Sequence, residues 1–253
     1  LKNLPIVPIT DLTIKDNSLI VATQGRSIWI LDDLTVLHQL SESTKEPKLY
    51  KPKDAYRMRG SGGTKSLTAG TNLPNGVIVH YYLPSFNNEN DEVKLSIHSK
   101  DGELIKEFSN KSCENKIQVK EGGNSFVWNM KYPGAKRLDN MVLWAADFSG
   151  AKAVPGDYIV KLSVNQTELT QNFKILKDPT SEGTIDNINA QFDFVNEINN
   201  IVDEAHNAII NIRKIKSDLS KFQSEFADNE LVNDLIEMSN SITSSLDLSL
   251  IHI

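Results

Sequence analysis

Apolar and polar residues alternate along several stretches between Asn75 and Leu176. Alternation with a period of two is typical of strands that bury one face, because successive side chains point to opposite sides of a sheet. Several such strands separated by turns are typical of two sheets packed face to face. We therefore predict an antiparallel β-sandwich over residues 74–178. The alternating apolar positions are Val77, Val79 and Tyr81; Val93, Leu95 and Ile97; Phe126, Trp128 and Met130; and Tyr158, Val160, Leu162 and Val164.

Turn residues separate these stretches and favour an immunoglobulin-like arrangement of the strands. Asp101-Gly102 stands between two strand patterns and predicts a two-residue hairpin with a type I′ turn. Asn165-Gln166 predicts a second hairpin of the same kind. The segment between Tyr132 and Val154 has no regular pattern, so we expect it to carry exposed aromatic side chains.

Three short β-rich runs occupy the first forty residues, at 12–14, 19–22 and 27–33. Asp16-Asn17-Ser18 separates the first two runs and has the composition of a turn. Three short strands make up most of one blade of a β-propeller, but a single blade cannot bury its faces alone. We expect residues 1–40 either to form the edge of a larger propeller or to dock elsewhere.

Residues 41–73 have the composition of a linker. Serine, lysine, proline and glycine dominate, and the segment includes Gly60-Ser61-Gly62-Gly63. A phosphate-binding loop is disfavoured, because no strand pattern precedes these glycines and no Gly-Lys-Ser/Thr sequence leads into a helix after them.

From Thr184 onward the apolar residues recur at steps of three and four, which predicts a helix. Thr184 or Asp186 is a candidate N-cap. A second helix is predicted over about residues 228–244, so that residues 179–247 form a helical hairpin. Isolated helices are marginal in water, and these therefore need a partner surface. The apolar positions of the first helix are Ile188, Phe192, Val195, Val202, Ala205, Ile209, Ile212, Leu219 and Phe226.

Charge is distributed unevenly along the 253 residues, whose formal net charge is −6. From Ser181 onward there are 4 Lys+Arg and 13 Asp+Glu, whereas the preceding part carries a net charge of +3. An acidic C-terminal region without a basic patch argues against nucleic acid and against anionic membranes as partners. The acidic helices are either a solvated face or an interaction surface. No run approaches the ~18 apolar residues that a transmembrane helix needs.

No arrangement of residues points to catalysis, to a cofactor or to a metal. Asp32 and Asp33 are adjacent on a strand and point to opposite faces, so they are predicted to cap the strand end rather than to act as a glycosidase pair. The five histidines lack metal-ligand spacing, and Cys113 is the single cysteine. Trp128 alternates with apolar neighbours and is predicted in the core. The candidate ligand-contact residues are Trp144, Phe148 and Tyr132.

The run Val21-Ala22-Thr23-Gln24-Gly25-Arg26-Ser27-Ile28-Trp29-Ile30-Leu31-Asp32-Asp33-Leu34 resembles the closing blade of bacterial BNR-repeat, sortilin-like β-propeller proteins, often labelled putative glycosyl hydrolases. Residues 51–57 resemble the linker of that family, and Pro74-Asn75-Gly76-Val77, residues 124–134 and Val154-Pro155-Gly156-Asp157-Tyr158 resemble its sandwich. The sandwich also resembles the immunoglobulin-like domains of flagellar hook-capping proteins. The likeness covers roughly residues 10–225, but the family's Asp-box repeats (Ser-x-Asp-x-Gly-x-Thr-Trp) are not in this sequence.

The resemblance implies that this chain is the C-terminal part of a longer, exported bacterial protein, located in the periplasm, at the outer membrane or outside the cell. Its partner would be the upstream propeller of the same protein. Its role would be a non-catalytic one, supporting the propeller and contacting carbohydrate or protein. One alternative is the accessory end of a glycoside hydrolase whose active site lies in the propeller; another is a cell-surface structural or adhesion module. Residues 248–253 resemble translated sequencing adapter.

Overall fold

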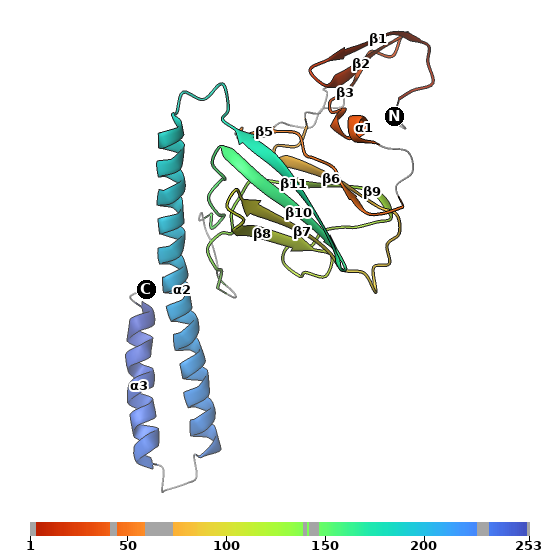
Figure 1. The fold of residues 1–253 in the computed structure, drawn as a ribbon. Helices are drawn as coiled ribbons and strands as arrows, with labels where there is room; N and C mark the ends of the chain where they lie inside the picture. The colour runs from red at the N-terminus through yellow and green to blue at the C-terminus, as the bar shows by residue number, and fades with distance from the viewer. Residues whose placement is uncertain are drawn as a thin grey trace. The chain divides into compact units, whose positions relative to one another are not determined.

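The computed structural model describes residues 4–40, 45–58, 73–138, 141, 147–226 and 233–251. Within these residues the protein is mainly β, with three sheets followed by a C-terminal pair of helices (Figure 1). The chain divides into two compact units. The first comprises Leu1–Tyr132 and Lys152–Asn189, and the second comprises Pro133–Ala151 and Ala190–Ile253.

The N-terminal sheet consists of β1 (Ile9–Lys15), β2 (Ser18–Thr23) and β3 (Ile28–Leu31), antiparallel and in sequence order. Asp16 and Asn17 connect β1 to β2 with φ angles of 49° and 65°, as a type I′ turn requires. Residues opposite one another on paired strands share a face. One face of this sheet is apolar, and the other is apolar along β3 and the middle of β2 but carries Asp11, Thr13 and Lys15 along β1. One face carries Leu12, Ile14, Leu19, Val21, Trp29 and Leu31; the other carries Ile20, Ala22, Ile28 and Ile30.

Two further sheets pack face to face. The smaller contains β4 (Lys48–Leu49), β6 (Val77–Leu83) and β9 (Gly122–Trp128), in the order β4-β6-β9. The larger has the order β5-β11-β10-β7-β8. Its strands are β5 (Ala55–Tyr56), β7 (Val93–Ser99), β8 (Leu104–Ser109), β10 (Gly156–Val164) and β11 (Thr167–Leu176). All pairings are antiparallel except that of β5 with β11.

The core between these two sheets follows the predicted alternation, since buried and half-buried residues alternate along the whole of β6. Trp128 is fully buried, and its ring lies 6.0 Å from that of Tyr158 and 6.3 Å from that of Phe173. Its indole Nε1 donates to the carbonyl oxygen of Lys131 at 3.2 Å, so that the buried donor is satisfied. The placement of Trp128 in the core is confirmed.

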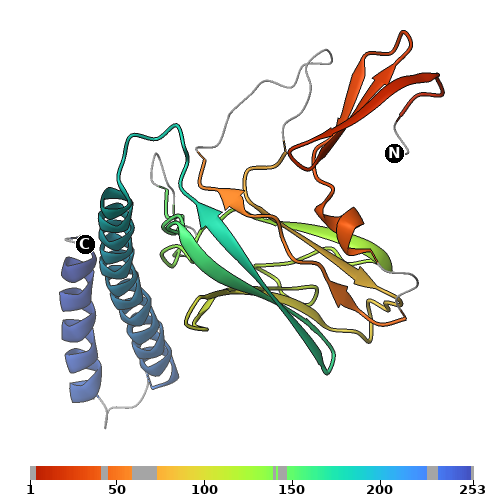
Figure 2. The same ribbon diagram turned by 45° about the horizontal axis from the view of Figure 1, so that its top comes forward.

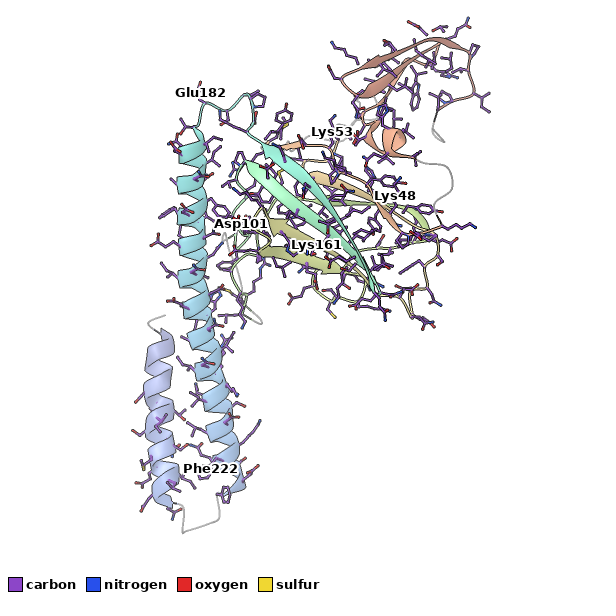
Figure 3. All side chains as sticks on the ribbon, in the orientation of Figure 1. Lys48, Lys53, Asp101, Lys161, Glu182 and Phe222 are labelled. Carbon is purple, nitrogen blue, oxygen red and sulfur yellow. The ribbon has the colours of Figure 1, made fainter. Side chains whose placement is uncertain are left out.

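Both predicted sandwich hairpins form, but both turns differ from the predicted type I′. Only Gly102 has a positive φ, 88°; the Gly102 amide donates to the Ser99 carbonyl, and the Ser99 amide donates to Glu103. Asp101, labelled in Figure 3, therefore lies in a three-residue loop that ends on a left-handed glycine, and the type I′ prediction was wrong. The physical reason is that glycine adopts this conformation without cost, whereas a residue with a Cβ does so only with strain. Asn165-Gln166 forms the predicted two-residue turn, but only Asn165 has a positive φ, 52°, so this turn is not of type I′ either.

The linker predicted over residues 41–73 contributes to both sheets. Lys48–Leu49 pairs with β6 and Ala55–Tyr56 pairs with β11, and Leu49 and Tyr50 are buried. The prediction of a linker is therefore wrong for these two strands, because tertiary pairing gives their backbone groups partners that a sequence pattern of two residues cannot reveal.

The two predicted helices are α2 (Ile185–Glu225) and α3 (Asn233–Ile251). Thr184 caps α2: its Oγ1 accepts from the Asn187 amide at 3.1 Å, and Asn187 Oδ1 accepts from the Thr184 amide at 3.0 Å. The helices run side by side in Figures 1 and 2, and Gln223 Nε2 donates to Ser239 Oγ and Asn240 Oδ1, both at 2.9 Å. None of the helices in the described part of the chain is both long enough and apolar enough to span a membrane.

Candidate functional site

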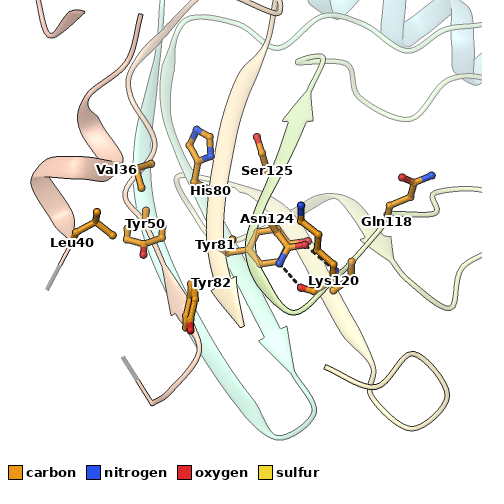
Figure 4. A pocket seen from close by; sticks show the side chains of 12 residues that line it. Val36, Leu40, Tyr50, His80, Tyr81, Tyr82, Gln118, Lys120, Asn124 and Ser125 are labelled. Carbon is orange, nitrogen blue, oxygen red and sulfur yellow. Dashed lines mark hydrogen bonds between the residues drawn. The ribbon is translucent and has the colours of Figure 1, made fainter. Parts of the chain in front are cut away.

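A cavity of about 700 Å³ lies over the outer face of the β4-β6-β9 sheet, in the first unit (Figure 4). Alternation along β6 sends Val79, Tyr81 and Leu83 into the core, and so directs His80 and Tyr82 outward. The cavity is therefore a consequence of the same pattern that builds the core.

Next to His80 and Tyr82, the neighbouring strands place the polar side chains of Ser125 and Tyr50 and the open space at Gly123. Ser125 of β9 is the cross-strand partner of His80, and Gly123 is the partner of Tyr82. A Cβ at Gly123 would meet no atom within 4 Å, so the wall is open at this point. Tyr50 follows β4, and its amide donates to the His80 carbonyl at 3.0 Å.

The other wall comes from α1 (Thr35–Gln39) and the residue that follows it. Val36 and Leu40 line the cavity across from the tyrosines. The orientation of α1 is held by Asp33, whose Oδ1 accepts from the Thr35 amide at 2.9 Å and from Asn17 Nδ2 at 3.1 Å. Asp33 thus ends β3 and begins the helix, the structural role that the sequence predicted for it.

The third side of the cavity is the segment before β9, and Asn124 fixes it. Asn124 Oδ1 accepts from the Lys120 amide at 2.9 Å, and its Nδ2 donates to the carbonyls of Lys120 at 2.7 Å and Gly122 at 3.0 Å. Gln118 and Lys120 are thereby positioned at the rim. Because the Asn124 amide uses its hydrogen bonds internally, its role at the cavity is to shape the wall.

Burial and charge set the protonation states in the cavity. Burial lowers the pKa of His80, and the nearby Asp33 opposes this only in part, so the imidazole is neutral at pH 7. Burial raises the pKa of Tyr50, and the neighbouring Tyr82 raises it further. Lys48 Nζ lies 5.3 Å from the centre of the Tyr50 ring and donates to the Gln39 carbonyl at 2.6 Å. The cavity thus presents aromatic rings, a neutral imidazole and a hydroxyl.

Such a lining suits an uncharged ligand that has both an apolar face and hydroxyl groups. Tyrosine rings give flat apolar surface with a polar edge, and a few hydrogen-bonding groups among apolar ones give orientation. A sugar has both kinds of surface. The hydroxyl, imidazole and amide groups among the lining residues can form hydrogen bonds with such a ligand.

The residues predicted to contact a ligand lie elsewhere. Tyr132 is half-buried against the core of the first unit and shares a hydrogen bond with Tyr158; burial raises the pKa of the Tyr132 phenol. Phe148 belongs to the second unit, where its ring lies 5.5 Å from that of His206. Trp144 lies outside the described residues. Tyr132 belongs to the first unit, and neither Tyr132 nor Phe148 is among the residues that line the cavity.

The cavity residues were missed by the sequence reasoning, although a signal existed. Tyr81 and Tyr82 are adjacent on a predicted strand, and one of two adjacent strand residues must point away from the core. An outward tyrosine beside an outward histidine two positions earlier was the available clue. Tyr50 and Val36 could not be placed beside them without the tertiary pairing.

Within the described part of the chain, no three His, Cys, Asp or Glu side chains are grouped so that they could hold a metal ion. No known protein family matches this chain, and no curated protein matches it.

Proposed function

We propose that this chain is the non-catalytic C-terminal accessory region of an exported β-propeller protein of the BNR-repeat, sortilin-like type. The N-terminal sheet closes the propeller, the two packed sheets form an immunoglobulin-like domain, and the helices follow. The region supports the propeller and contacts carbohydrate.

One observation carries the supporting role: the β1-β2-β3 sheet exposes large apolar side chains on both faces. Leu12 and Ile14 on the apolar face are 59% and 65% exposed, and Ile28 and Ile30 on the other face are 66% and 56% exposed. On this second face the polar side chains are those of β1 and Ser18, and the β3 edge is apolar. Exposed apolar side chains on both faces favour a sheet that lies between two other layers, as a propeller blade lies between its neighbours.

The strand order supports the immunoglobulin-like assignment. In that fold the first, second and fifth strands (A, B, E) share one sheet, and the third, sixth and seventh (C, F, G) share the other. If β4 and β5 are taken as one edge strand that changes sheets, then β6 and β9 occupy the B and E positions, and β7, β10 and β11 occupy C, F and G.

Tyr158, at the start of β10, adds a second point of agreement. Its hydroxyl donates to the Val154 carbonyl at 2.8 Å, the kind of bond that a tyrosine corner makes near the start of the sixth strand. The buried Trp128 departs from the antibody pattern, since it lies on β9 rather than on the third strand.

The supporting role is tested by the coding sequence that precedes Leu1 and by the longer protein that it encodes. We expect repeated four-stranded units behind a signal sequence. In a Cys113→Ser background, cysteines at Leu12 and Ile28 should react rapidly with a thiol reagent in the 253-residue chain and slowly in the longer protein. A cysteine at Asp16, in the exposed turn, is the control and should react rapidly in both.

Two results would decide against the supporting role. If the cysteines at Leu12 and Ile28 stay equally reactive in the longer protein, the sheet is not covered by the propeller. If no repeats precede Leu1, a surface structural or adhesion module is the better account. Paired carboxylates in the upstream blades would instead assign the parent to the glycoside hydrolases.

Contact with carbohydrate is favoured by the cavity lined by Tyr50, His80 and Tyr82. We expect the 253-residue chain to bind oligosaccharides on a glycan array, and Tyr82→Ala to weaken binding of the best ligand by about tenfold or more, because a stacking ring is removed. Tyr56→Ala removes an exposed tyrosine that lies outside this cavity and should leave binding unchanged. Equal binding by the wild type and Tyr82→Ala would exclude the cavity as the site.

A further inference from the structure

A regular apolar stripe runs along most of α2. It differs from the positions used to predict the helix in its N-terminal part and shares Ala205, Ile212, Leu219 and Phe226 with them. Starting at Phe194, every position at alternating steps of four and three is apolar as far as Phe226. This spacing has a period of 3.5, and when it is sustained for more than three heptads it is typical of a helix that packs along another helix. The residues of this α2 stripe are Phe194, Ile198, Ile201, Ala205, Ala208, Ile212, Ile215, Leu219, Phe222 and Phe226.

Helix α3 covers only the C-terminal part of the stripe. Ile212, Leu219 and Phe222 are half-buried, whereas Ile215 and Phe226 in the same part of the stripe stay exposed. The bonds from Gln223 to α3 lie in this region. Phe222 is labelled near the C-terminal end of α2 in Figure 3. At 1.5 Å per residue, α2 with 41 residues is ~61 Å long and α3 with 19 residues is ~28 Å long, so α3 spans about half of α2.

The N-terminal part of the stripe is exposed. Phe194 is 62% exposed, Ile198 43% and Ile201 60%, and they follow one another at the heptad spacing of the covered part. Three large apolar side chains in a row on one helix face form a patch of the kind that marks an interaction site.

A different face of α2 is already occupied. The segment 133–150 contacts it through the Lys136 amide, which donates to Asp203 Oδ1, and through Lys136 Nζ, which donates to Asn207 Oδ1 at 3.2 Å. His206 is bonded to the Lys136 carbonyl and contacts the ring of Phe148. None of these helix residues belongs to the stripe, so the contacts that Lys136 and Phe148 make with α2 leave Phe194, Ile198 and Ile201 exposed.

Charge indicates what would fit the exposed part. Between Ile185 and Ile212 there are five acidic residues and no lysine or arginine. Glu197 and Glu204 flank the stripe directly, because each precedes a stripe residue by one position. A second copy of α2 packed antiparallel would set these glutamates against one another, which is unfavourable. A helix with basic flanks would instead pair with them.

We propose that the N-terminal half of α2 docks an amphipathic helix of a partner protein, one with apolar residues at heptad spacing and Lys or Arg beside them. The apolar stripe supplies the contact area, and the acidic flanks select the partner and set its direction. This inference goes beyond the supporting and carbohydrate-contacting roles and stands independently of them.

The probe for a test is a synthetic peptide of about four heptads with Leu at the a and d positions and Lys at e and g. Its matched control has Glu at e and g. We expect the full chain to bind the Lys peptide, as measured by fluorescence anisotropy, and to bind it more weakly at high salt because the flanking charges are exposed. The Glu peptide should not bind.

Two variants of the full chain locate the site. Ile198→Ser combined with Ile201→Ser should weaken binding of the Lys peptide by about tenfold or more. Asn200→Ser, an exposed substitution on the same helix outside the stripe, should leave binding unchanged, and circular dichroism checks that both variants stay helical. If helicity falls in the double variant, Glu197→Gln with Glu204→Gln serves in its place and should reduce both the affinity and its dependence on salt.

Three results would overturn the proposal. The first is the absence of binding by the Lys peptide. The second is equal binding by the wild type and by the variants of the stripe. The third is a dimeric chain in light scattering that becomes monomeric in the Ile198→Ser, Ile201→Ser variant, which would assign the stripe to a second copy.

Discussion

Gly76 should not tolerate even one added methyl group. It precedes β6, where the first pair of the β6-β9 ladder joins Val77 to Trp128. A Cβ at Gly76 would lie 2.4 Å from the Trp128 carbonyl oxygen and 2.8 Å from Val127 Cγ1. An ordinary contact begins near 3.4 Å, so the two strands would have to separate by about 1 Å at the pair that anchors the buried indole.

The expected cost follows from that displacement. Overpacking of this kind lowers the free energy of unfolding by roughly 1–3 kcal/mol. For a unit of this size, each kcal/mol lowers Tm by about 2–4 °C, so Gly76→Ala should melt roughly 2–12 °C below the wild type.

Gly156 provides the matched control. It also begins a strand, but a Cβ there would meet no atom within 4 Å. Gly156→Ala should therefore raise stability by about 0.4–1 kcal/mol, because alanine has less backbone freedom to lose on folding. The two substitutions add the same methyl group and are expected to shift Tm in opposite directions.

Near-UV circular dichroism is the suitable probe, because α2 and α3 dominate the far-UV signal. The packed rings of Trp128, Tyr158 and Phe173 supply the near-UV signal of the sandwich. A Tm for Gly76→Ala equal to that of the wild type, or one lower for Gly156→Ala than for Gly76→Ala, would refute the reasoning.

Three further outcomes are expected. Tyr158→Phe removes a buried hydroxyl that donates to Val154, and should lower the free energy of unfolding by about 0.5–1.5 kcal/mol in a urea titration; an unchanged midpoint would contradict the role given to this bond. Burial raises the pKa of Tyr81 to about 12, so the folded chain keeps a proton that the unfolded chain releases near pH 10; the contribution of Tyr81 to stability is constant below pH 10 and falls as the pH rises toward 12. Tyr81→Phe should make the loss of stability above pH 10 less steep, and the remaining loss includes the contribution of Tyr158, whose pKa burial also raises. Gly134→Ala would drive a Cβ into the Phe148 carbonyl oxygen and should loosen the chain around Gly134, so that trypsin cleaves faster after Lys136 and Arg137; an unchanged cleavage rate would show that this close approach is not required.

Periodicity was informative wherever local packing decides structure. The alternation along residues 77–83, the change of period at Thr184 and the burial of Trp128 were all predictable, because a strand or helix long enough to show its period also shows which side is buried. The surroundings of the candidate ligand residues could not be predicted from the sequence. Tyr132 is half-buried against the core and Phe148 contacts His206, and the spacing of residues along the chain indicates neither contact.

The sequence by itself determined the core faces of the long strands, the change to a helical period at Thr184 and the acidic character of α2, since these depend on residues close together in the chain. It left Thr184 and Asp186 as alternative N-caps, and it placed the second helix at about residues 228–244, whereas α3 spans Asn233–Ile251. The tertiary structure alone decided that the short strand β4 pairs within the smaller sheet and the short strand β5 within the larger one. It also decided that Tyr50, His80 and Tyr82 line one cavity, and that α3 covers only part of the α2 stripe. These features depend on pairing between segments far apart in sequence, and a local pattern carries no information on which distant segment provides the partner.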